Sequence, residues 1–233
     1  MNIAIIPARG GSKRMPRKNI SDFHGQPIIY YPIKVALDSG LFERVFVSTE
    51  DAEIADVAKR GGAEIVERPL ALADDHTGTQ AVMRHALECL RTMDVFPEFA
   101  CCIYATTPFL HKNYLIEGWK MMAHQSKPPY AFSVKRYDSA IQRSLRRNKQ
   151  GQMEIVWPQF ADTRSQDLEP RWRDAGQFYW GRPEAFMQDV PIFKSGAMGV
   201  PMPHFMAIDI DDQDDWKFAS FVYAGMRAAG QLP

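Results

Sequence analysis

The sequence contains few cysteines and no long hydrophobic run. Its three cysteines, Cys89, Cys101 and Cys102, show neither C-x-x-C nor metal-ligand spacing, and an odd number does not suit a disulfide framework. No apolar stretch approaches the roughly 18 residues that a membrane span needs, and the N-terminus lacks the features of a secretory signal. These absences predict a cytoplasmic protein that works without a membrane.

A net charge of one sign is also missing. The 233 residues carry 28 basic and 28 acidic side chains, so nothing overall attracts the protein to nucleic acid or to an anionic surface. The charges are segregated along the chain, with a basic cluster near the N-terminus and an acidic one near the C-terminus. The basic cluster is Arg9, Lys13, Arg14, Arg17 and Lys18, and the acidic one is Asp209, Asp211, Asp212, Asp214 and Asp215.

The basic cluster follows directly after an apolar run. Residues 1–6 have no polar face, which is typical of a strand buried on both sides of a parallel sheet. Gly10 and Gly11 then allow backbone N–H groups to approach a ligand closely. Because ligands of open α/β sheets bind at the carboxyl ends of strands, we interpret this loop as a phosphate-binding site. The alternative is a solvated loop with incidental charges, and the spacing matches neither the P-loop nor the dinucleotide fingerprint.

Strand and helix patterns alternate through the first half of the chain and indicate an α/β fold. We expect a Rossmann-like, doubly wound, mostly parallel sheet. The expected strands are 1–6, 44–49, 63–66, 100–105, 198–201 and 206–210, and the expected helices are 26–37, 51–60, 80–91, 113–124, 183–188 and 212–229. With 45% hydrophobic residues, the chain is long enough for one large domain with a sizeable core.

The alternation breaks between residues 130 and 180. Strand candidates at 130–134, 152–157 and 177–180 have no helices between them, which indicates a small antiparallel insertion. We therefore expect residues 1–129 and 181–233 to form a nucleotide-binding α/β domain, with 130–180 as an insertion lobe. Exposed strand edges in such a lobe usually need covering, so we expect it to support a homodimer and to contact the substrate.

The sequence Ile208-Asp209-Ile210-Asp211 is the second informative stretch. In a strand, Asp209 and Asp211 would point to the same side while the two isoleucines enter the core. Two neighbouring carboxylates repel each other unless a cation lies between them, and Mg²⁺ favours one or two carboxylates with phosphate oxygens and waters. Capping of the last helix is the alternative for Asp211 or Asp212, but it does not account for Asp209.

A cationic glycine loop together with an aspartate pair indicates a nucleoside triphosphate with Mg²⁺. Cations and metal would share the charge of a pyrophosphate leaving group, while the protein aligns an attacking oxygen with the α-phosphorus. Nucleic-acid binding is a weak alternative, because the chain is neutral overall and no stacking motif accompanies the basic loop.

Four motifs in register resemble the CMP-sugar synthetases that activate sialic acid and KDO-like sugars. They are I-P-A-R-G-G-S-K-x-x-P-R-K-N at the N-terminus, V-S-T-E-D at 47–51, E-R-P-x-x-L-A-x-D at 67–75 and I-D-I-D at 208–211. The resemblance covers nearly the whole chain. It implies a fold of the nucleotidyltransferase type and a cytidylyltransferase that joins CTP and a nonulosonic acid into a CMP-sugar, with release of pyrophosphate.

The resemblance also implies roles for individual residues. Arg9 and Lys18 would contact the triphosphate, and Asp209 and Asp211 would bind Mg²⁺, so these four form the expected catalytic set. The expected nucleotide-binding residues are Ala8, Arg9, Gly10, Gly11, Ser12, Lys18, Asn19, Arg68, Asp75 and Thr79. The nucleophile would be the anomeric hydroxyl of the sugar. A general base is not evident, and Asp209 acting through a metal-bound hydroxyl is the least strained candidate.

Departures from the sialic acid pattern bear on the sugar. Ala105 takes the place of the glutamine in the motif Q-P-T-S-P, and Arg14 replaces a small glycine. The strings at 141–143, 164–169 and 174–181 resemble the branch of the family that uses pseudaminic acid. The expected sugar-binding residues are Ala105, Thr107, Gln142, Arg164, Gln166, Arg173, Gln177 and Tyr179.

The chemistry of pseudaminic acid suits this set of residues. The sugar keeps a C1 carboxylate, which Arg164 or Arg173 would bind, but it has a methyl group in place of part of the glycerol tail and a second acylated amine. For Tyr179, packing in the core is an equal alternative. Two other functions remain open: a cytidylyltransferase for another nonulosonic acid, and a catalytically silent nucleotide-binding protein.

Overall fold

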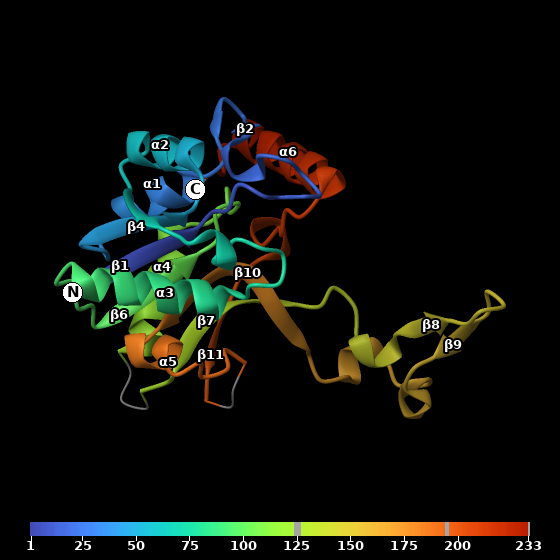
Figure 1. Ribbon diagram of the computed structural model, residues 1–233. Coiled ribbons are helices and arrows are strands. Elements are labelled where there is room, and N and C mark those ends of the chain that lie inside the picture. The colour runs from blue at the N-terminus through green and yellow to red at the C-terminus, as the bar shows by residue number, and fades with distance from the viewer. Residues whose placement is uncertain (124–126, 194–195, 233) are drawn as a thin grey trace.

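A seven-stranded, mostly parallel sheet forms the centre of the molecule (Figure 1). The computed structural model describes residues 1–123, 127–193 and 196–232. The strand order is β11-β7-β10-β6-β1-β4-β5, and in this sheet only β10 runs antiparallel to its neighbours. The strands are β1 (Asn2–Pro7), β4 (Arg44–Thr49), β5 (Glu64–Glu67), β6 (Phe99–Ile103), β7 (Tyr130–Arg136), β10 (Trp172–Gly181) and β11 (Met198–Pro201). The predicted α/β architecture is confirmed.

Helices cover both faces of this sheet. The helices are α1 (Tyr30–Asp38), α2 (Ala52–Arg60), α3 (Thr79–Thr92), α4 (Lys112–Met122), α5 (Pro183–Met187) and α6 (Gln213–Ala228). Buried residues of α1, α2 and α4 share one core cluster, and those of α3 and α5 share the cluster on the other face. A third cluster packs α6 against Phe23, Ile28 and Phe109.

Strand β1 shows why an apolar run without a polar face forms the central strand. Ala4 and Ile6 enter the core beneath α1 and α2, whereas Ile3 and Ile5 enter the core beneath α3. All four side chains are fully buried, as expected for a strand covered on both faces. β1 pairs with β4 on one side and with β6 on the other.

The order of the strands creates a crevice beside β1. The chain passes from β1 to β4 and β5 on one side and then returns to β6 on the other. The connections that leave the carboxyl ends of β1 and β6 therefore diverge. This is the point of an open α/β sheet at which ligands bind.

The insertion is smaller than the sequence predicted. β7 and β10, which the expected boundaries 130–180 assign to a separate lobe, belong to the central sheet. What projects from the body is residues 137–171, with a hairpin of β8 (Leu145–Arg147) and β9 (Met153–Ile155) near its end (Figure 1). The absence of helices between the strands indicated antiparallel pairing but could not show that two of them join the main sheet.

Two local predictions need correction. The helix expected from residue 26 begins at Tyr30, because Gln26–Pro27 (β3) pairs with Asp22–Phe23 (β2). Pro32 then lies in the first turn of α1, where its missing N–H costs little. The strand expected at 206–210 does not form: a 3₁₀ turn at His204–Met206 leads into irregular backbone.

Most helix and strand bounds agree with expectation within two residues. The helix expected at 113–124 ends at Met122 in the structure, and residue 124 lies outside the described part of the chain. Within the described residues, no helix has both the length and the hydrophobicity that spanning a bilayer requires.

We predict that Gly118 is required for α4 to pack on the sheet. An added Cβ would lie 2.7 Å from Trp180 Cδ1 and 3.0 Å from Phe178 Cε2, and both rings are fully buried. Trp180 is also held in place because its indole N–H donates to the Leu115 carbonyl (3.0 Å). Gly118→Ala should lower the free energy of unfolding by about 1–3 kcal/mol, as measured by urea denaturation.

Gly225→Ala is the matched control, because Gly225 lies in α6 with no atom within 4 Å of an added Cβ. Helix propensity alone should make that variant more stable by about 0.5–1 kcal/mol. Equal effects of the two substitutions would contradict the packing argument.

Candidate active site

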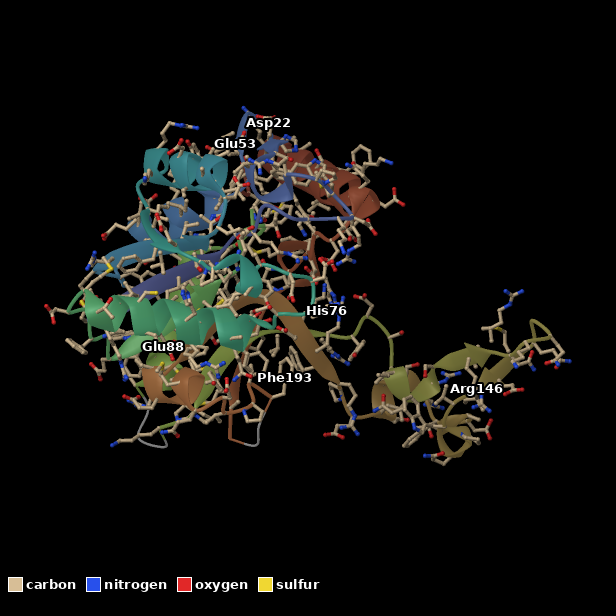
Figure 2. All side chains as sticks on the ribbon, in the orientation of Figure 1. Asp22, Glu53, His76, Glu88, Arg146 and Phe193 are labelled. Atoms are coloured by element: carbon tan, nitrogen blue, oxygen red, sulfur yellow. The ribbon has the colours of Figure 1, made fainter. Side chains whose placement is uncertain are left out.

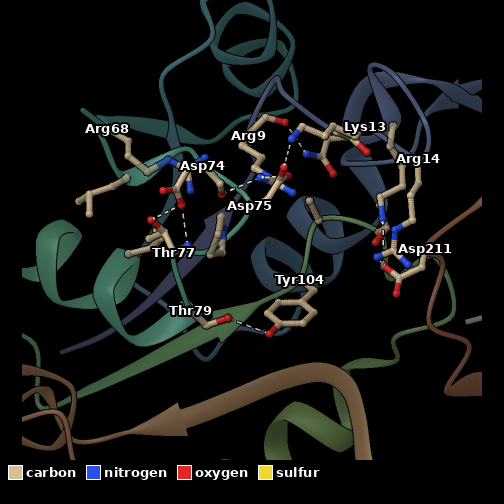
Figure 3. A pocket seen from close by; sticks show the side chains of 18 of the residues that line it. Arg9, Lys13, Arg14, Arg68, Asp74, Asp75, Thr77, Thr79, Tyr104 and Asp211 are labelled. Carbon is tan, nitrogen blue, oxygen red and sulfur yellow. Dashed lines mark hydrogen bonds and ion pairs between the residues drawn. The ribbon is translucent and has the colours of Figure 1, made fainter. Parts of the chain in front are cut away.

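A cleft of about 600 Å³ opens at the crevice beside β1 (Figure 3). Its walls come from the loop after β1, the loop after β5, the beginning of α3, the residues after β6, and the segment that precedes α6. Segments from the two ends of the chain therefore border the same space. The site lies where the strand order places it.

Four of the five cations in the N-terminal loop line this cleft: Arg9, Lys13, Arg14 and Lys18. Arg17 does not. Its guanidinium contacts the carboxylates of Asp51 (Nη2 to Oδ1, 3.1 Å) and Glu53 at the beginning of α2. Hydrogen bonding from Arg17 lowers the pKa of Asp51, whose other role is to cap α2 by accepting from the Ile54 N–H. Arg17 thus anchors the loop to the body.

Two loop cations converge on Asp75. The Arg9 guanidinium lies 2.8 Å from one carboxylate oxygen of Asp75, and the Lys13 ammonium pairs with the other. Arg9 also donates to the Asp74 carbonyl (2.6 Å). These contacts join the loop after β1 to the loop after β5, and the hydrogen bonds from Lys13 and Arg9 lower the pKa of Asp75.

Asp209 and Asp211 line the same cleft as Arg9 and Lys18. The Asp211 carboxylate lies 3.0 Å from the Arg14 guanidinium and 3.7 Å from the Lys18 ammonium. Burial and, next, the charge of Asp211 raise the pKa of Asp209. A divalent cation between the two carboxylates would relieve that repulsion.

The number of metal-ligating side chains at the cleft limits which metal ion could bind there. Among the described residues, no group of three or more His, Cys, Asp or Glu side chains is placed to hold a metal ion. Two carboxylates on their own fit Mg²⁺, which takes its remaining ligands from phosphate oxygens and water. The residues present therefore suit a metal that arrives with a phosphorylated substrate.

Hydrogen bonds from side chains hold the segment that carries Asp209 and Asp211, because this segment does not pair with a strand. Lys135 of β7 donates to the Ala207 carbonyl (2.6 Å), and Gln177 of β10 donates to the Ile208 carbonyl (3.3 Å). These two bonds supply partners that a neighbouring strand would otherwise provide.

Lys18 donates to a third carbonyl, that of Ile210. The isoleucines at 208 and 210 are buried, and the aspartates at 209 and 211 border the cleft. The predicted alternation of side chains is therefore present although the predicted strand is absent. Burial lowers the pKa of Lys18, and the nearby carboxylates act in the opposite direction.

Most of the other C-terminal aspartates cap α6. Asp212 accepts from the N–H groups of Asp214 (2.9 Å) and Asp215 (3.0 Å). Asp215 in turn accepts from the N–H groups of Asp211 and Asp212, which completes a capping box. The capping alternative therefore holds for Asp212, and it leaves the carboxylates of Asp209 and Asp211 for the cleft.

A buried ion pair stabilises the N-terminal loop. Arg68, whose side chain is 3% exposed, lies 2.9 Å from one oxygen of Glu50, and the other oxygen accepts from the Gly10 N–H (2.7 Å). Burial lowers the pKa of Arg68. The two expected glycines have different roles: a Cβ on Gly10 would approach Asp51 to 2.5 Å, whereas Gly11 faces open space.

Tyr104 forms part of the cleft wall, although the sequence analysis did not include it. Its hydroxyl is bonded to the Thr79 hydroxyl (2.8 Å), and its ring lies 5.4 Å from that of Tyr179. Burial raises the pKa of Tyr104 to about 12, so the phenol stays protonated. When Q-P-T-S-P is aligned on its last proline, Pro108, the glutamine falls on Tyr104 and not on Ala105.

Comparisons with known proteins identify the family of this chain. A family model described as "Cytidylyltransferase" matches residues 3–149, which is more than half of the chain. The pseudaminic acid cytidylyltransferase of Campylobacter jejuni is 39% identical over 95% of this chain and 96% of its own. This chain belongs to the cytidylyltransferase family.

This cytidylyltransferase also resembles a second curated protein in sequence and a solved structure in fold. N-acylneuraminate cytidylyltransferase A of Danio rerio is 30% identical over 93% of this chain and 49% of its own length. A solved CMP:2-keto-3-deoxy-manno-octonic acid synthetase in complex with CTP shares the fold, with a TM-score of 0.70 at 15% identity over 96% of this chain and 98% of that one.

The expected nucleotide-site residues come together in the cytidylyltransferase cleft. Those that line it are Arg9, Ser12, Lys18, Asn19, Arg68, Asp75, Thr79, Asp209 and Asp211. Asn19 also donates to the Arg9 carbonyl (2.9 Å) and so shapes the loop. Ala8 is buried and, like Gly10 and Gly11, does not contribute to the lining.

Ala105 lines the cleft, but the other expected sugar-binding residues do not. Thr107, Gln142, Gln177 and Tyr179 are buried and bonded within the protein. Arg164 and Gln166 are exposed on the projecting arm, and Arg173 lines a separate hollow. Sequence position indicated which strand or loop each residue belongs to, but not whether its side chain points to solvent.

Glu50 and Lys135 are further residues that the sequence analysis did not assign to the site. For Glu50 a signal was available, because it lies within the V-S-T-E-D motif. No sequence signal indicated a role for Lys135, because a single lysine near the end of a strand is usually exposed. Its importance is evident only from its burial, 8% exposed, against the segment that carries Asp209.

We predict that the Glu50 carboxylate stabilises the folded state through Arg68. Glu50→Gln keeps an oxygen for the Gly10 N–H but leaves the Arg68 charge buried without its partner. The free energy of unfolding should fall by about 3 kcal/mol in urea denaturation. Glu53→Gln is the control, because that exposed carboxylate pairs with Arg17 at the surface and should change stability by less than about 1 kcal/mol. A smaller loss for Glu50→Gln than for Glu53→Gln would refute this assignment.

Proposed function

We propose that this cytidylyltransferase transfers CMP from CTP to the anomeric hydroxyl of pseudaminic acid and releases pyrophosphate. The observation that carries the proposal is the meeting of the N-terminal cations with Asp209 and Asp211 in one cleft. The sugar is inferred from the Campylobacter jejuni relative, which matches over nearly the full length of both chains. The weaker identity to N-acylneuraminate cytidylyltransferases makes another nonulosonic acid the second candidate.

In this proposal the N-terminal loop binds the triphosphate. Arg9 presents a planar guanidinium that binds two phosphate oxygens, and the Lys18 ammonium follows oxygens whose positions change during the reaction. The Lys18 side chain is only 15% exposed, so its charge acts at close range with little screening by water. Arg68 and Thr79, from the loop after β5 and the beginning of α3, would contact the nucleoside.

Asp209 and Asp211 would hold Mg²⁺ in the cleft that they line together with Arg9. The ion, when bound, would neutralise charge on the phosphate oxygens. Lys18 and Arg14 lie beside Asp211 and keep that carboxylate in position. The protein then needs mainly to align the sugar hydroxyl with the α-phosphorus, because positioning and charge stabilisation account for most of the catalysis of phosphoryl transfer.

Pyrophosphate release tests the proposed function. The protein is incubated with CTP, Mg²⁺ and pseudaminic acid, and in parallel with N-acetylneuraminic and legionaminic acids. We expect the highest kcat/KM with pseudaminic acid and no release without Mg²⁺. Asp211→Asn should lower kcat by at least about 100-fold, because it removes a ligand of the metal. Asp214→Asn, at the exposed end of α6, is the control that should retain activity.

The outcomes separate the alternatives. A preference for N-acetylneuraminic acid would assign the protein to another sugar. Binding of CTP without release of pyrophosphate from it in the presence of any of the sugars would indicate the silent nucleotide-binding protein.

We also propose that the protein is a homodimer and that the projecting arm forms the contact. The arm and its base expose Leu145, Met153, Trp157 and Trp172, which is unusual for a segment that stands apart from the core. Figure 2 shows Arg146 on the arm, well separated from His76 on the loop beside the cleft. A second copy would cover these apolar side chains.

Sedimentation equilibrium tests the dimer. The wild-type protein should sediment as a dimer, and the double variant Leu145→Glu and Met153→Glu should be monomeric with unchanged circular dichroism. Leu70→Glu is the control, because Leu70 is 80% exposed on the body of the molecule and should not affect assembly. A wild-type monomer at micromolar concentration would rule out the proposed dimer.

A further inference from the structure

Asp75 is an acidic residue that contacts two cations of the N-terminal loop. One of its carboxylate oxygens lies 2.8 Å from the Arg9 guanidinium, and the other lies 2.5 Å from the Lys13 ammonium (Figure 3). Each oxygen therefore contacts one cation. Asp75 belongs to the loop between β5 and α3, both cations belong to the loop after β1, and all three residues line the cleft.

An ionised carboxylate in this position cannot bind the phosphates of a nucleotide directly. It has no N–H or O–H group to donate, and its negative charge repels theirs. Guanidinium and ammonium groups, in contrast, bind carboxylates and phosphates in the same way, through charge-assisted hydrogen bonds. The Asp75 carboxylate and a phosphate group in the cleft would therefore compete for Arg9 and Lys13.

The turn that contains Asp75 holds Arg9 through a second contact. The carbonyl of Asp74 accepts from the Arg9 guanidinium (2.6 Å). The Asp74 carboxylate is used within the turn, where it accepts from the N–H groups of His76 (3.0 Å) and Thr77 (2.6 Å). When a phosphate displaces the Asp75 carboxylate, Arg9 would thus keep its contact with the Asp74 carbonyl and remain at the cleft.

Partial exposure makes the contact with Asp75 easy to exchange. The side chains of Arg9 and Asp75 are 32% and 31% exposed, and that of Lys13 is 83% exposed. Ion pairs with this much exposure contribute little to stability, because water screens the charges and ordering the side chains costs entropy. The buried Arg68–Glu50 pair differs in this respect, since breaking it would leave a charge without water or partner.

We propose that Asp75 promotes the release of pyrophosphate by competing with it for Arg9 and Lys13. This inference rests on the proposed function. CTP would displace the Asp75 carboxylate when it binds, and the carboxylate would displace pyrophosphate after CMP has been transferred. The competition weakens both ligands, but only CTP has a nucleoside whose contacts compensate. Product release limits the turnover of many enzymes, so a competitor of the product is useful there.

This role differs in sign from the nucleotide contact that the sequence predicted for Asp75. Removal of a residue that binds the nucleotide, or that only holds the two loops together, weakens the binding of polyphosphates. Removal of a competitor strengthens it. The binding of pyrophosphate to variants of Asp75 therefore distinguishes the two roles.

Calorimetry with pyrophosphate tests the proposal on the full-length protein, without CTP or sugar and with EDTA to remove metal ions. Asp75→Asn should lower the Kd for pyrophosphate by about 10-fold, because it removes a negative charge close to the bound anion. Asp75→Glu should stay within about threefold of the wild type, because it keeps that charge. Circular dichroism of each variant checks that it is folded.

Glu67→Gln is the matched control. Glu67 is an exposed acidic residue at the end of β5 and does not line the cleft. Its neutralisation should change the Kd for pyrophosphate by less than about twofold, because water and salt screen an exposed charge outside the site.

A double-mutant cycle with Lys13 tests the competition itself. In the wild type Asp75 neutralises part of the Lys13 charge, so Lys13→Met should weaken pyrophosphate binding only modestly. In the Asp75→Asn background the same change should weaken binding several-fold more, because groups in contact have non-additive effects. In turnover assays, Asp75→Asn should lower the inhibition constant of pyrophosphate without raising KM for CTP.

Two results would overturn the proposal: pyrophosphate binding to Asp75→Asn that is equal to or weaker than binding to the wild type, or an effect of Lys13→Met that is the same in both backgrounds. Either would show that Asp75 holds the loop or contacts the nucleotide. These measurements need neither sugar nor turnover. A wild-type protein that is inactive with every acid sugar would instead refute the proposed function, whatever the binding results are.

Discussion

The structure depends on the approach of positive and negative groups from opposite ends of the chain. Lys18 lies at this junction: its ammonium donates to the Ile210 carbonyl and lies 3.7 Å from the Asp211 carboxylate. Without such cations, Asp209 and Asp211 would repel each other and raise the energy of the folded state. The charges that hold the two ends of the chain together are those that a metal-bound triphosphate would engage.

Rigid supports around the cleft keep these charges in place. The Glu50–Arg68 pair holds the N-terminal loop through Gly10, and Arg17 joins that loop to α2. On the opposite side, Lys135 and Gln177 hold the carbonyls of the segment before Asp209. The charged groups of the cleft are therefore fixed by ion pairs and hydrogen bonds to neighbouring residues, which is how preorganised sites avoid reorganisation during a reaction.

The fold could be predicted because each helix and strand has its own pattern in a short stretch of sequence. Buried strands such as β1 and β4 are short apolar runs, and α2 has a capping aspartate and a glycine stop, so each element is identified from its own residues. The N-terminal half of the site followed from the same kind of signal. The positions of the expected sugar-binding residues did not, because Gln177 and Tyr179 lie beside a register shift in β10, and their orientation depends on the neighbouring strands.

The sequence alone determined the α/β class, the cationic loop after β1 and the placement of the Asp209 and Asp211 side chains on the same side of the chain, because these follow from hydrophobic pattern and charge within short stretches. Only the tertiary structure decided that Arg17 is an anchor, that β7 and β10 belong to the main sheet, and that Lys135 is buried beneath the aspartate segment. The physical reason is that burial and ion pairing are properties of contacts between residues far apart in the chain. A lysine at the end of a strand is exposed or buried according to what packs over it, and here that is a segment about seventy residues further along.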